Sequence, residues 1–591
     1  MAVVDRGARR RRPRRGSVPQ RLRVAAALRE SFAQGYSTRD LRADLLAGAV
    51  VGVVALPLSM ALAIAVGVPP QHGLYTAIVA GAVVALFGGS RVQVSGPTAA
   101  FVAVLAPITA TYGVGGLLLA TLMAGAILIV LAVSGLGRLI ELVPYPVTTG
   151  FTAGIGVVIA TLQIRDALGL TVAAWPESTF EKVIELAKAL PSVRVADGTI
   201  ALLTLAVLLT WPRIQRSIPA PLVALTVAAL AAAVIARYAP EHAVATIRDR
   251  FSTEVDGVMV AGIPRSLPSP VLPWRLPGAD GAPLAVSWEL IRELLPAAGA
   301  IAVLGAIESL LSAVIADGMT RRQHDPDAEL LGQGLGNLIA PFFGGIAATG
   351  AIARTATNVR SGARSPIAAV AHSAVLLLSV LALAPLLGYL PLAALAALLL
   401  VVAWTMSDVP HVVRTLRTAP RSDVAVLLVC LALTVVFDMV LAIGVGIVLA
   451  ALLFMRRMAG VSTVRLVARH HPEIDRPVPD GMLVYEVAGP LFFGAATRAM
   501  RALATTAADV RVVLLDLRRV PAIDATGEVN LASAVERLRH AGIVVVLAGI
   551  ASQPLRTLLR AGWERRGDRL TIHRTFEDGF EAAARAVAGT P

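Results

Sequence analysis

The chain has 591 residues, of which 56% are hydrophobic and only 16% carry a charge. A soluble protein normally carries about 25% charged residues. Apolar runs of about 20 residues, the length that crosses a bilayer, recur between Asp44 and Met458. This composition excludes a soluble globular protein and predicts a polytopic α-helical membrane protein. The single cysteine, Cys430, excludes an intrachain disulfide framework and a cysteine-based metal cluster.

The net charge of +14 is concentrated near the N-terminus, where residues 1–44 contain twelve arginines and four acidic residues. No short apolar region with a cleavage site follows, so a secretory signal peptide is not predicted. Basic residues before a first span mark the cytoplasmic side and contact anionic lipid. We therefore expect residues 1–36 to form a disordered basic arm in the cytoplasm, in preference to a segment that binds nucleic acid.

Apolar segments broken by proline and glycine continue through residues 37–460, the predicted transmembrane domain. Residues 176–189 are amphipathic and predict an interfacial helix. Residues 238–287 are polar and proline-rich, and they predict a long exposed loop on the periplasmic side. The predicted spans have approximate ranges 45–66, 74–87, 97–108, 115–133, 135–143, 147–162, 198–211 and 222–237, then 288–316, 331–343, 366–387, 390–406, 424–437 and 439–455.

The stretch from Val94 to Phe101 has a hydroxyl, a glycine and a proline within this apolar landscape. Ser95 is a plausible N-cap, and Pro97 suits the first turn of a helix because its missing N–H is not needed there. A helix that begins at membrane depth leaves its first N–H groups in need of a partner. An anion is the natural partner, because a helix N-terminus carries partial positive charge. The alternative is an ordinary loop between two spans.

A second interrupted segment, Thr349-Gly350-Ala351, stands at a matching place in the second half. In both halves a long span, a short span and a Gly-Gly pair precede the small residues. Two interrupted segments at matching places are the best sequence indication of a transporter site near the bilayer midplane. The backbone N–H groups that follow Ser95 and Thr349 should then form an anion cradle. Coincidence among glycine-rich membrane helices is the alternative.

Two charged residues lie close to these segments. Glu308 is an acidic residue inside a long predicted span, and such residues usually face a cavity. It suits the binding and release of a proton or cation, and Ser312, one turn later on the same face, could hydrogen-bond the carboxyl group or help to hold a cation. Arg354 lies in the first turn of the second interrupted helix, where a cation opposes the helix dipole and indicates a nearby anion. The alternatives are a structural carboxylate for Glu308 and snorkelling to an interface for Arg354.

From residue 461 to 591 the composition changes to that of a soluble α/β domain. The pattern predicts strands at 482–487, 491–493, 511–517 and 543–547, and helices at 495–505, after Thr526, at 554–561 and at 576–588. No metal-ligand spacing among the nine histidines and no catalytic motif is found, so an enzyme, a metal site and a bound cofactor are not expected.

With these pieces placed, the chain resembles the SulP family of anion permeases along nearly its whole length. The resemblance rests on Gly73-Leu74-Tyr75-Thr76, on the stretch from Val94 to Phe101, on residues 350–363 and on a C-terminal domain similar to a STAS domain. It implies a fourteen-segment membrane domain built as a seven-plus-seven inverted repeat. It also implies a homodimer, with both termini and the STAS domain in the cytoplasm of a bacterial inner-membrane protein.

Within the family, residues 305–311, 333–337 and 489–493 resemble the branch of bacterial aerobic C4-dicarboxylic acid transporters. This resemblance implies proton-coupled uptake of succinate, fumarate or aspartate. A sulfate or bicarbonate transporter, coupled to protons or sodium or acting as an exchanger, is the alternative. A more distant alternative is a channel-like or sensory protein that signals through its STAS domain to a cytoplasmic partner.

The expected site residues follow from these arguments. For substrate binding they are Ser95, Gly96, Thr98, Thr349, Gly350, Ala351 and Arg354, and for coupling to a proton or sodium ion they are Glu308 and Ser312. In the STAS domain, Asp524-Ala525-Thr526-Gly527 stands at the position of the phosphorylated loop of anti-sigma-factor antagonists. Thr526 could therefore accept a phosphate, although the favoured reading makes it the N-cap of the next helix.

Overall fold

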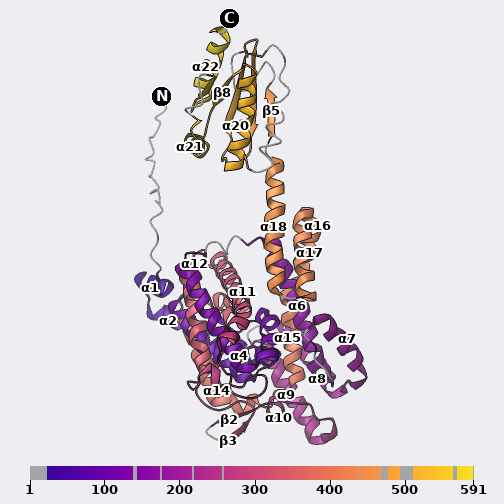
Figure 1. Cartoon of the computed structure of the whole chain (residues 1–591). Coiled ribbons are helices and arrows are strands. Elements are labelled where there is room, and N and C mark those ends of the chain that lie inside the picture. Colours follow the sequence, from indigo (N-terminus) through magenta and orange to yellow (C-terminus); the bar gives the residue numbers. More distant parts are fainter. Residues whose placement is uncertain are drawn as a thin grey trace. The chain divides into compact units, whose positions relative to one another are not determined.

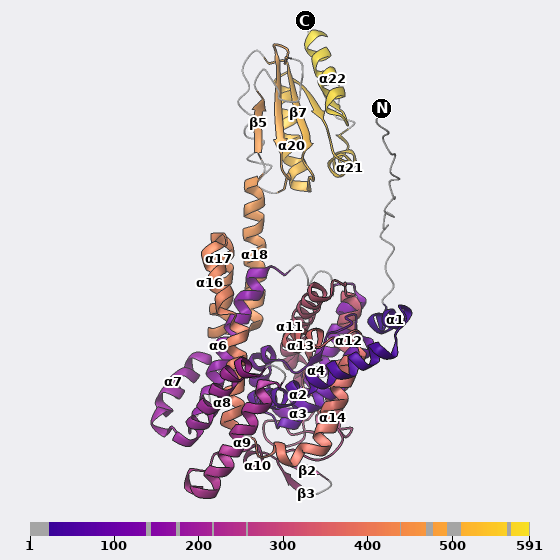
Figure 2. The same cartoon turned by 180° about the vertical axis from the view of Figure 1, so that it is seen from behind.

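The computed structural model describes residues 23–137, 143–172, 176, 178–215, 218–255, 258–437, 439–461, 463–467, 477–492, 510–563 and 569–589. The chain forms two compact units, the first ending at Ile447 and the second beginning at Val448. Figures 1 and 2 show the elements of each unit from two sides. The first unit is helical apart from two very short strand pairings, and the second is an α/β domain.

Ten helices in the described part of the chain are long and apolar enough to cross a membrane, which confirms the polytopic prediction. The helices of the first half are α1 (Ala26–Ala33), α2 (Thr38–Val66), α3 (Pro70–Phe87), α4 (Ala99–Val133), α6 (Tyr145–Leu168), α7 (Thr179–Ala189), α8 (Val195–Ile214) and α9 (Ala220–Tyr238). Those of the second half are α11 (Trp288–Thr320), α12 (Pro326–Ile339), α13 (Ile352–Arg360), α14 (Ile367–Leu387), α15 (Leu392–Ser407), α16 (Val409–Thr418), α17 (Arg421–Val436) and α18 (Met439–Val461).

The helix α4 is interrupted at Gly113, whose φ of 68° and ψ of −172° are not helical. A Cβ at this glycine would lie 2.3 Å from the backbone of Gly278, so the close approach also requires glycine. When α4 is counted as two segments and the short helices α1, α7, α10 (Ile247–Arg250) and α16 are set aside, seven helical segments remain in each half of the described chain. These are α2, α3, both parts of α4, α6, α8 and α9, then α11 to α15, α17 and α18.

The membrane helices pack in two groups. In the first group α2 and α3 pack against α14, and α12 packs against α3 and α4, which also contacts α11. In the second group α6 packs against α15 and α17, and α8 packs against α9 and α15. Each group therefore takes helices from both halves of the sequence, and every residue of the site described below belongs to the first group.

The sequence predicted that the whole N-terminal arm is disordered, and this prediction is wrong for part of the arm. Residues 26–33 form the helix α1, and the N–H groups of Ala25 and Ala27 donate to the carbonyl oxygens of Phe87 and Gly88 at 3.2 and 3.4 Å. These carbonyls end α3 and have no partner within their own helix, so α1 docks there. Residues 1–22 lie outside the described residues.

Two other parts of the membrane domain differ from what the sequence predicted, and a third prediction is not tested. The span predicted at 135–143 begins at the turn after α4, and it stays a prediction because residues 138–142 lie outside the described residues. The predicted loop at 238–287 contains η2 (Pro240–His242), α10 (Ile247–Arg250), η3 (Pro273–Arg275) and a hairpin of β2 (Ser252–Val255) and β3 (Val258–Ala261). The amphipathic helix α16 was not predicted, because its short polar sequence resembles a loop.

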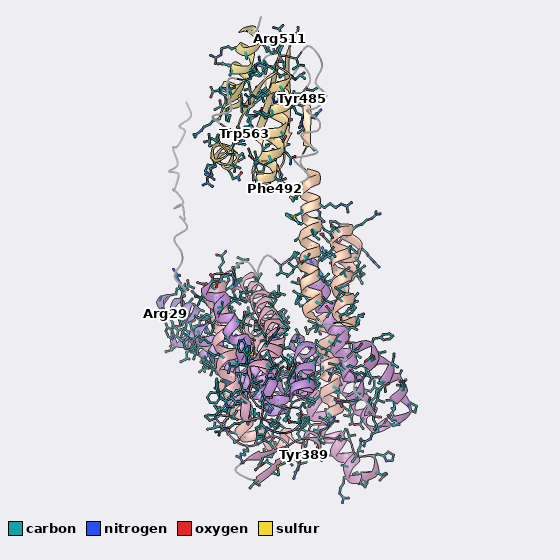
Figure 3. All side chains as sticks on the ribbon, viewed as in Figure 1. Arg29, Tyr389, Tyr485, Phe492, Arg511 and Trp563 are labelled. Atoms are coloured by element: carbon teal, nitrogen blue, oxygen red, sulfur yellow. The ribbon has the colours of Figure 1, made fainter. Side chains whose placement is uncertain are left out.

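The hairpin β2–β3 lies at the end of the membrane unit opposite to α1 and α12 (Figures 1 and 2). Arg248 of α10 donates a hydrogen bond of 2.8 Å to the hydroxyl of Tyr389, which Figure 3 shows at the same end. The long loop is thus tied to the connection between α14 and α15.

The C-terminal unit is a five-stranded sheet with helices on both faces. Its strand order is β5-β6-β7-β8-β9, and only the β5–β6 pairing is antiparallel. One face carries the core with Leu531, Leu558 and Trp563, and the other carries Phe576 and Phe580. The elements are β5 (Thr463–Val467), β6 (Met482–Ala488), β7 (Val512–Arg519), α20 (Ala525–His540), β8 (Val544–Ala548), α21 (Ser552–Arg560), β9 (Leu570–Ile572) and α22 (Phe576–Gly589).

The α/β prediction for this unit is confirmed, with local differences. In place of the predicted strand at 491–493, the described residues contain an isolated bridge from Leu491 to Ile523. The predicted helix at 495–505 lies outside the described residues. Asp524, rather than Thr526, is the N-cap of α20, because its carboxylate accepts the Gly527 N–H at 2.6 Å. Thr526 is exposed in the first turn.

Candidate functional site

The two interrupted segments of the sequence meet in the structure. The strand β1 (Ser95–Gly96) pairs antiparallel with β4 (Thr349–Gly350), with Ser95 opposite Gly350 and Gly96 opposite Thr349. The Ala351 N–H donates to the Val94 carbonyl at 2.9 Å and extends this pairing. Because α4 and α13 begin directly after these strands, the pairing brings the N-termini of both helices together in opposite directions.

Neither helix N-terminus is capped by a side chain. The N-cap of α4 is Thr98, and that of α13 is Ala351. The prediction that Ser95 caps the first helix is wrong, since Ser95 lies in β1 and its hydroxyl accepts a hydrogen bond of 2.8 Å from Gln333. The first-turn N–H groups of both helices therefore stay available to an anion, as the cradle requires.

Arg354 is only 2% exposed, which excludes snorkelling to an interface. Its Nη2 donates to the Ser59 hydroxyl at 3.2 Å and to the Pro97 carbonyl at 3.1 Å. Its Nε and Nη1 have no hydrogen-bond partner in the described part of the chain, where no carboxylate pairs with it either. A buried guanidinium without a counter-ion is costly. This cost favours an anion close by.

Glycine is required at two positions of the strand pair. A Cβ at Gly96 would lie 2.5 Å from Nη1 of Arg354, so the guanidinium lies directly beneath β1. A Cβ at Gly350 would lie 2.3 Å from Nε2 of Gln93 and 3.0 Å from the backbone of Ser309. The hydroxyl of Thr349 points away from the cradle and donates to the Gly305 carbonyl of α11 at 2.8 Å. Thr349 therefore serves the cradle through its backbone.

Glu308 lies on α11, beside the start of α4. Its carboxylate is 7% exposed and accepts a hydrogen bond of 2.9 Å from the Thr98 hydroxyl. The predicted bond from Ser312 to this carboxylate is not formed, because the Ser312 hydroxyl donates to that of Thr355 on α13 at 3.1 Å. Within the described residues Glu308 has no ion-pair partner and a single hydrogen-bond donor. The carboxylate is therefore sparsely held.

Sequence reasoning missed a second buried carboxylate, Glu329 of α12, which is 1% exposed. One oxygen accepts the N–H groups of Gly89 and Ser90, each at 3.0 Å. The other accepts Nε2 of Gln93 at 2.7 Å, the Ser309 hydroxyl at 3.0 Å and Nε2 of Gln333 at 3.2 Å. Five donors satisfy this carboxylate completely, so its role is to hold the loop before β1 against α11 and α12.

Further buried amides and hydroxyls fix the segments around the strand pair. Asn337 bonds both the N–H and the carbonyl of Ala348 at 2.7 and 2.9 Å, and Asn358 donates to the Val92 carbonyl at 2.9 Å. The Thr355 hydroxyl accepts the Val94 N–H at 3.1 Å. A signal for these residues existed, since polar side chains inside apolar spans are rare and usually functional.

The described residues include no group of three or more His, Cys, Asp or Glu side chains that could hold a metal ion. The site brings together two uncapped helix N-termini, a buried arginine and a carboxylate with a single hydrogen-bond donor. Facing broken helices with these groups define the class of helical membrane transporters.

Comparison with known proteins places the chain within this class. The model of the sulfate permease family matches residues 41–430, and that of the STAS domain matches residues 473–579. The chain therefore belongs to the sulfate permease family and is an anion transporter with a C-terminal STAS domain.

Two relatives and one solved structure show how far the similarity extends. The "Putative sulfate transporter YvdB" of Bacillus subtilis is 38% identical over 90% of this chain and 95% of its own. The bicarbonate transporter BicA of Picosynechococcus is 30% identical over 88% of this chain and 90% of its own. The inward-facing structure of murine Solute Carrier 26 family member A9 superposes with a TM-score of 0.79 at 18% identity, covering 99% of this chain and 100% of that one. At that identity the structure supports the fold alone.

Proposed function

We propose that the protein is a cation-coupled secondary transporter that takes up sulfate. The observation that carries this proposal is the buried Arg354 beneath β1, with two hydrogen-bonding nitrogens unpartnered and two uncapped helix N-termini beside it. Helix N-termini and an arginine together supply donors in several directions, as a tetrahedral oxyanion accepts them. The name of the Bacillus subtilis relative supports sulfate over a C4-dicarboxylate.

Bicarbonate is the second candidate, favoured by the similarity to BicA along most of both chains. Both anions are compact, and the residues at the strand pair, Gly96, Gly350 and Ala351, are small. These two relatives carry the names of a sulfate transporter and a bicarbonate transporter. The C4-dicarboxylate reading therefore rests on local sequence resemblance alone.

Coupling follows from the cost of moving charge. A dianion that enters against a potential of 100 mV costs about 4.6 kcal/mol, and a monoanion about 2.3 kcal/mol. A proton or sodium ion that binds with the anion offsets this cost. We assign the binding of this proton or sodium ion to Glu308, because its carboxylate accepts one hydrogen bond from a neutral donor, Thr98, at the start of α4.

Uptake into proteoliposomes tests the proposal. Purified protein is reconstituted and given radiolabelled sulfate, bicarbonate or succinate, under an imposed proton gradient, an imposed sodium gradient or neither. We expect gradient-driven accumulation of sulfate, or of bicarbonate for the second candidate. Accumulation of succinate alone would reverse the assignment in favour of a dicarboxylate carrier, and transport without accumulation would indicate a channel.

We further propose the setting that the family resemblance implies: a homodimer in the bacterial inner membrane, with both termini and the STAS domain in the cytoplasm. The basic residues near the N-terminus support this orientation. Cysteine labelling from either side, at Thr526→Cys in a Cys430→Ser background, tests it. Labelling only after the membrane is permeabilised supports a cytoplasmic STAS domain.

A further inference from the structure

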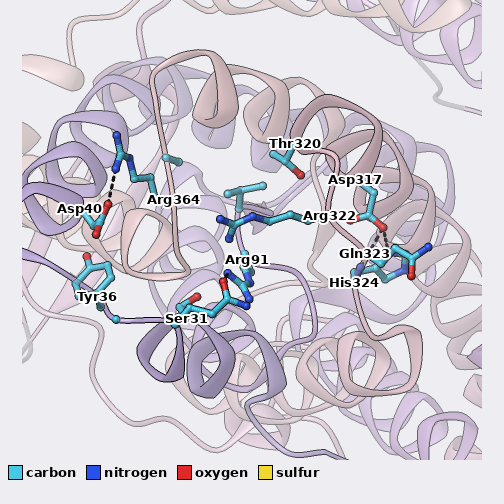
Figure 4. Close-up of a pocket in the computed structure, with 14 residues that line it drawn as sticks. Ser31, Tyr36, Asp40, Arg91, Asp317, Thr320, Arg322, Gln323, His324 and Arg364 are labelled. Atoms are coloured by element: carbon cyan, nitrogen blue, oxygen red, sulfur yellow. Dashed lines mark hydrogen bonds and ion pairs between the residues drawn. The ribbon is translucent and has the colours of Figure 1, made fainter. Parts of the chain in front are cut away.

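A polar pocket of about 480 Å³ lies at the end of the membrane unit that carries α1 (Figure 4). Its walls come from the α1–α2 connection, the loop after α3, the C-terminal end of α11 and the connection from α13 to α14. It is separate from the cradle, because Asp317 in its wall is nine residues beyond Glu308 on α11, about 13 Å along the helix axis. The volume is that of a small-molecule site.

Three arginines line this pocket, against two aspartates. Arg364 pairs with Asp40 at 2.6 Å, and Asp317 accepts a hydrogen bond of 2.8 Å from His324, so both carboxylates are already engaged. Figure 4 shows Arg91 and Arg322 in the middle of the view, between those two pairs. Arg91 pairs with Glu30, so Arg322 is the one lining arginine without an ion pair among the described residues, and an anion in the pocket would be its counter-ion.

The two central arginines differ in how they are held. Arg91 is fixed by Glu30 at 3.0 Å and by Gln34 at 2.7 Å, both from the α1 side. Arg322, just beyond the end of α11, has no ion pair or hydrogen bond within the described residues and is exposed. A fixed arginine and a free one on opposite walls form a clamp that can close on a ligand with several anionic oxygens. The planar guanidinium matches phosphate oxygens in a two-pronged geometry that lysine lacks.

We propose that this pocket is a second anion site, which binds a phosphate-bearing anion, either a free phosphate compound or the headgroup of an anionic lipid. The side-chain amides of Gln34 and Gln323, which also line the pocket, supply neutral donors beside the guanidinium groups. The ligand touches the end of α11, the helix that carries Glu308. It also touches the connection after α13, the helix that carries Arg354. Its binding therefore favours particular arrangements of α11 and α13, the helices that carry Glu308 and Arg354, and in this way regulates transport.

Calorimetric titration of the purified full-length protein with inorganic pyrophosphate tests the free-phosphate source. We expect saturable binding that Arg322→Ala weakens by about tenfold or more, the effect of losing one charge-assisted pair. Arg39→Ala is the matched control, because Arg39 is exposed near the pocket but does not line it. Arg354→Gln should retain pyrophosphate binding, and its loss there would place the anion in the cradle and overturn the proposal.

Native mass spectrometry after reconstitution with cardiolipin or phosphatidylglycerol tests the lipid source. Retained lipid that falls severalfold in Arg322→Ala but not in Arg39→Ala assigns the site to a headgroup. Because Arg322 is exposed and unpartnered, the variant should unfold at the wild-type temperature, which separates lost binding from lost folding. If neither pyrophosphate nor lipid shows binding that depends on Arg322, the proposal fails.

Discussion

The two buried carboxylates of the first helix group should respond in opposite ways to the same substitution. Glu308 accepts one hydrogen bond and Glu329 accepts five. A glutamine has nearly the shape of a glutamate but replaces one oxygen by an NH2 group that only donates. We predict that Glu308→Gln loses coupling at little cost in stability, whereas Glu329→Gln strongly destabilises the fold.

The magnitudes follow from the partners. In Glu329→Gln the NH2 group must face at least two donors, whichever way the amide turns. Hydrogen bonds to a charged group contribute about 1.5–3 kcal/mol each, so losing two costs about 3–6 kcal/mol. That is a large share of the 5–15 kcal/mol, roughly, that stabilises a typical protein. In Glu308→Gln the remaining oxygen still accepts from Thr98, and the loss should stay near about 1 kcal/mol.

Two measurements on each purified variant check this prediction. Thermal unfolding in detergent, followed by tryptophan fluorescence, should show a large drop of the midpoint for Glu329→Gln and a small one for Glu308→Gln. Proteoliposomes with Glu308→Gln should show no accumulation under a proton or sodium gradient, while anion exchange continues. The reasoning is refuted if Glu329→Gln is as stable as the wild type, or if Glu308→Gln still accumulates the anion.

Three other predictions concern single positions. Arg354→Lys should abolish uptake but leave the protein folded, because an ammonium cannot reach Ser59 and the helix N-termini at once; wild-type uptake would contradict the cradle. Gly96→Ala should reduce uptake at least about tenfold, since its Cβ displaces the Arg354 guanidinium at a cost of about 1–3 kcal/mol. Gly299→Ala, with open space around its Cβ, is the control that should behave as wild type. Burial and a hydrogen bond to Asp44 raise the pKa of Tyr36 to about 12. The folded protein thus holds this proton more tightly than the unfolded chain, and the resulting stability is present below pH 10.0 and lost as the pH rises toward 12. In Tyr36→Phe the free energy of unfolding should fall less steeply with pH over this range. An unchanged pH dependence would assign the loss of stability to other groups.

The sequence allowed the location of the site to be predicted because its breaks are local signals. A hydroxyl, a glycine and a proline in an apolar run predict an interruption, and the second run at Thr349 predicts its counterpart. Arg354 and Glu308 stand out because charges are rare at membrane depth. These inferences need only the composition of short windows, and the structure places the residues together.

The partners of these residues could not be predicted in the same way. Ser95 bonds Gln333, and Gln93 bonds Glu329, across more than 230 positions of the sequence. Membrane helices that are apolar on every side carry no periodic pattern that shows which face meets which neighbour. The assignment of Ser95 as an N-cap failed for this reason, because a local rule was applied to a residue whose partner is distant.

The contrast between Glu308 and Glu329 also indicates why the site contains two carboxylates. Glu329, with five donors, holds the loop before β1 in place, so we assign it a structural role. In the proposed coupling, Glu308, with one neutral donor, is the charge that varies during a transport cycle. If the anion enters beside Arg354, neutralising Glu308 with a proton or a sodium ion keeps the cradle from holding excess negative charge. Coupling between anion and cation then follows from electrostatics, without a mechanical link between separate binding sites.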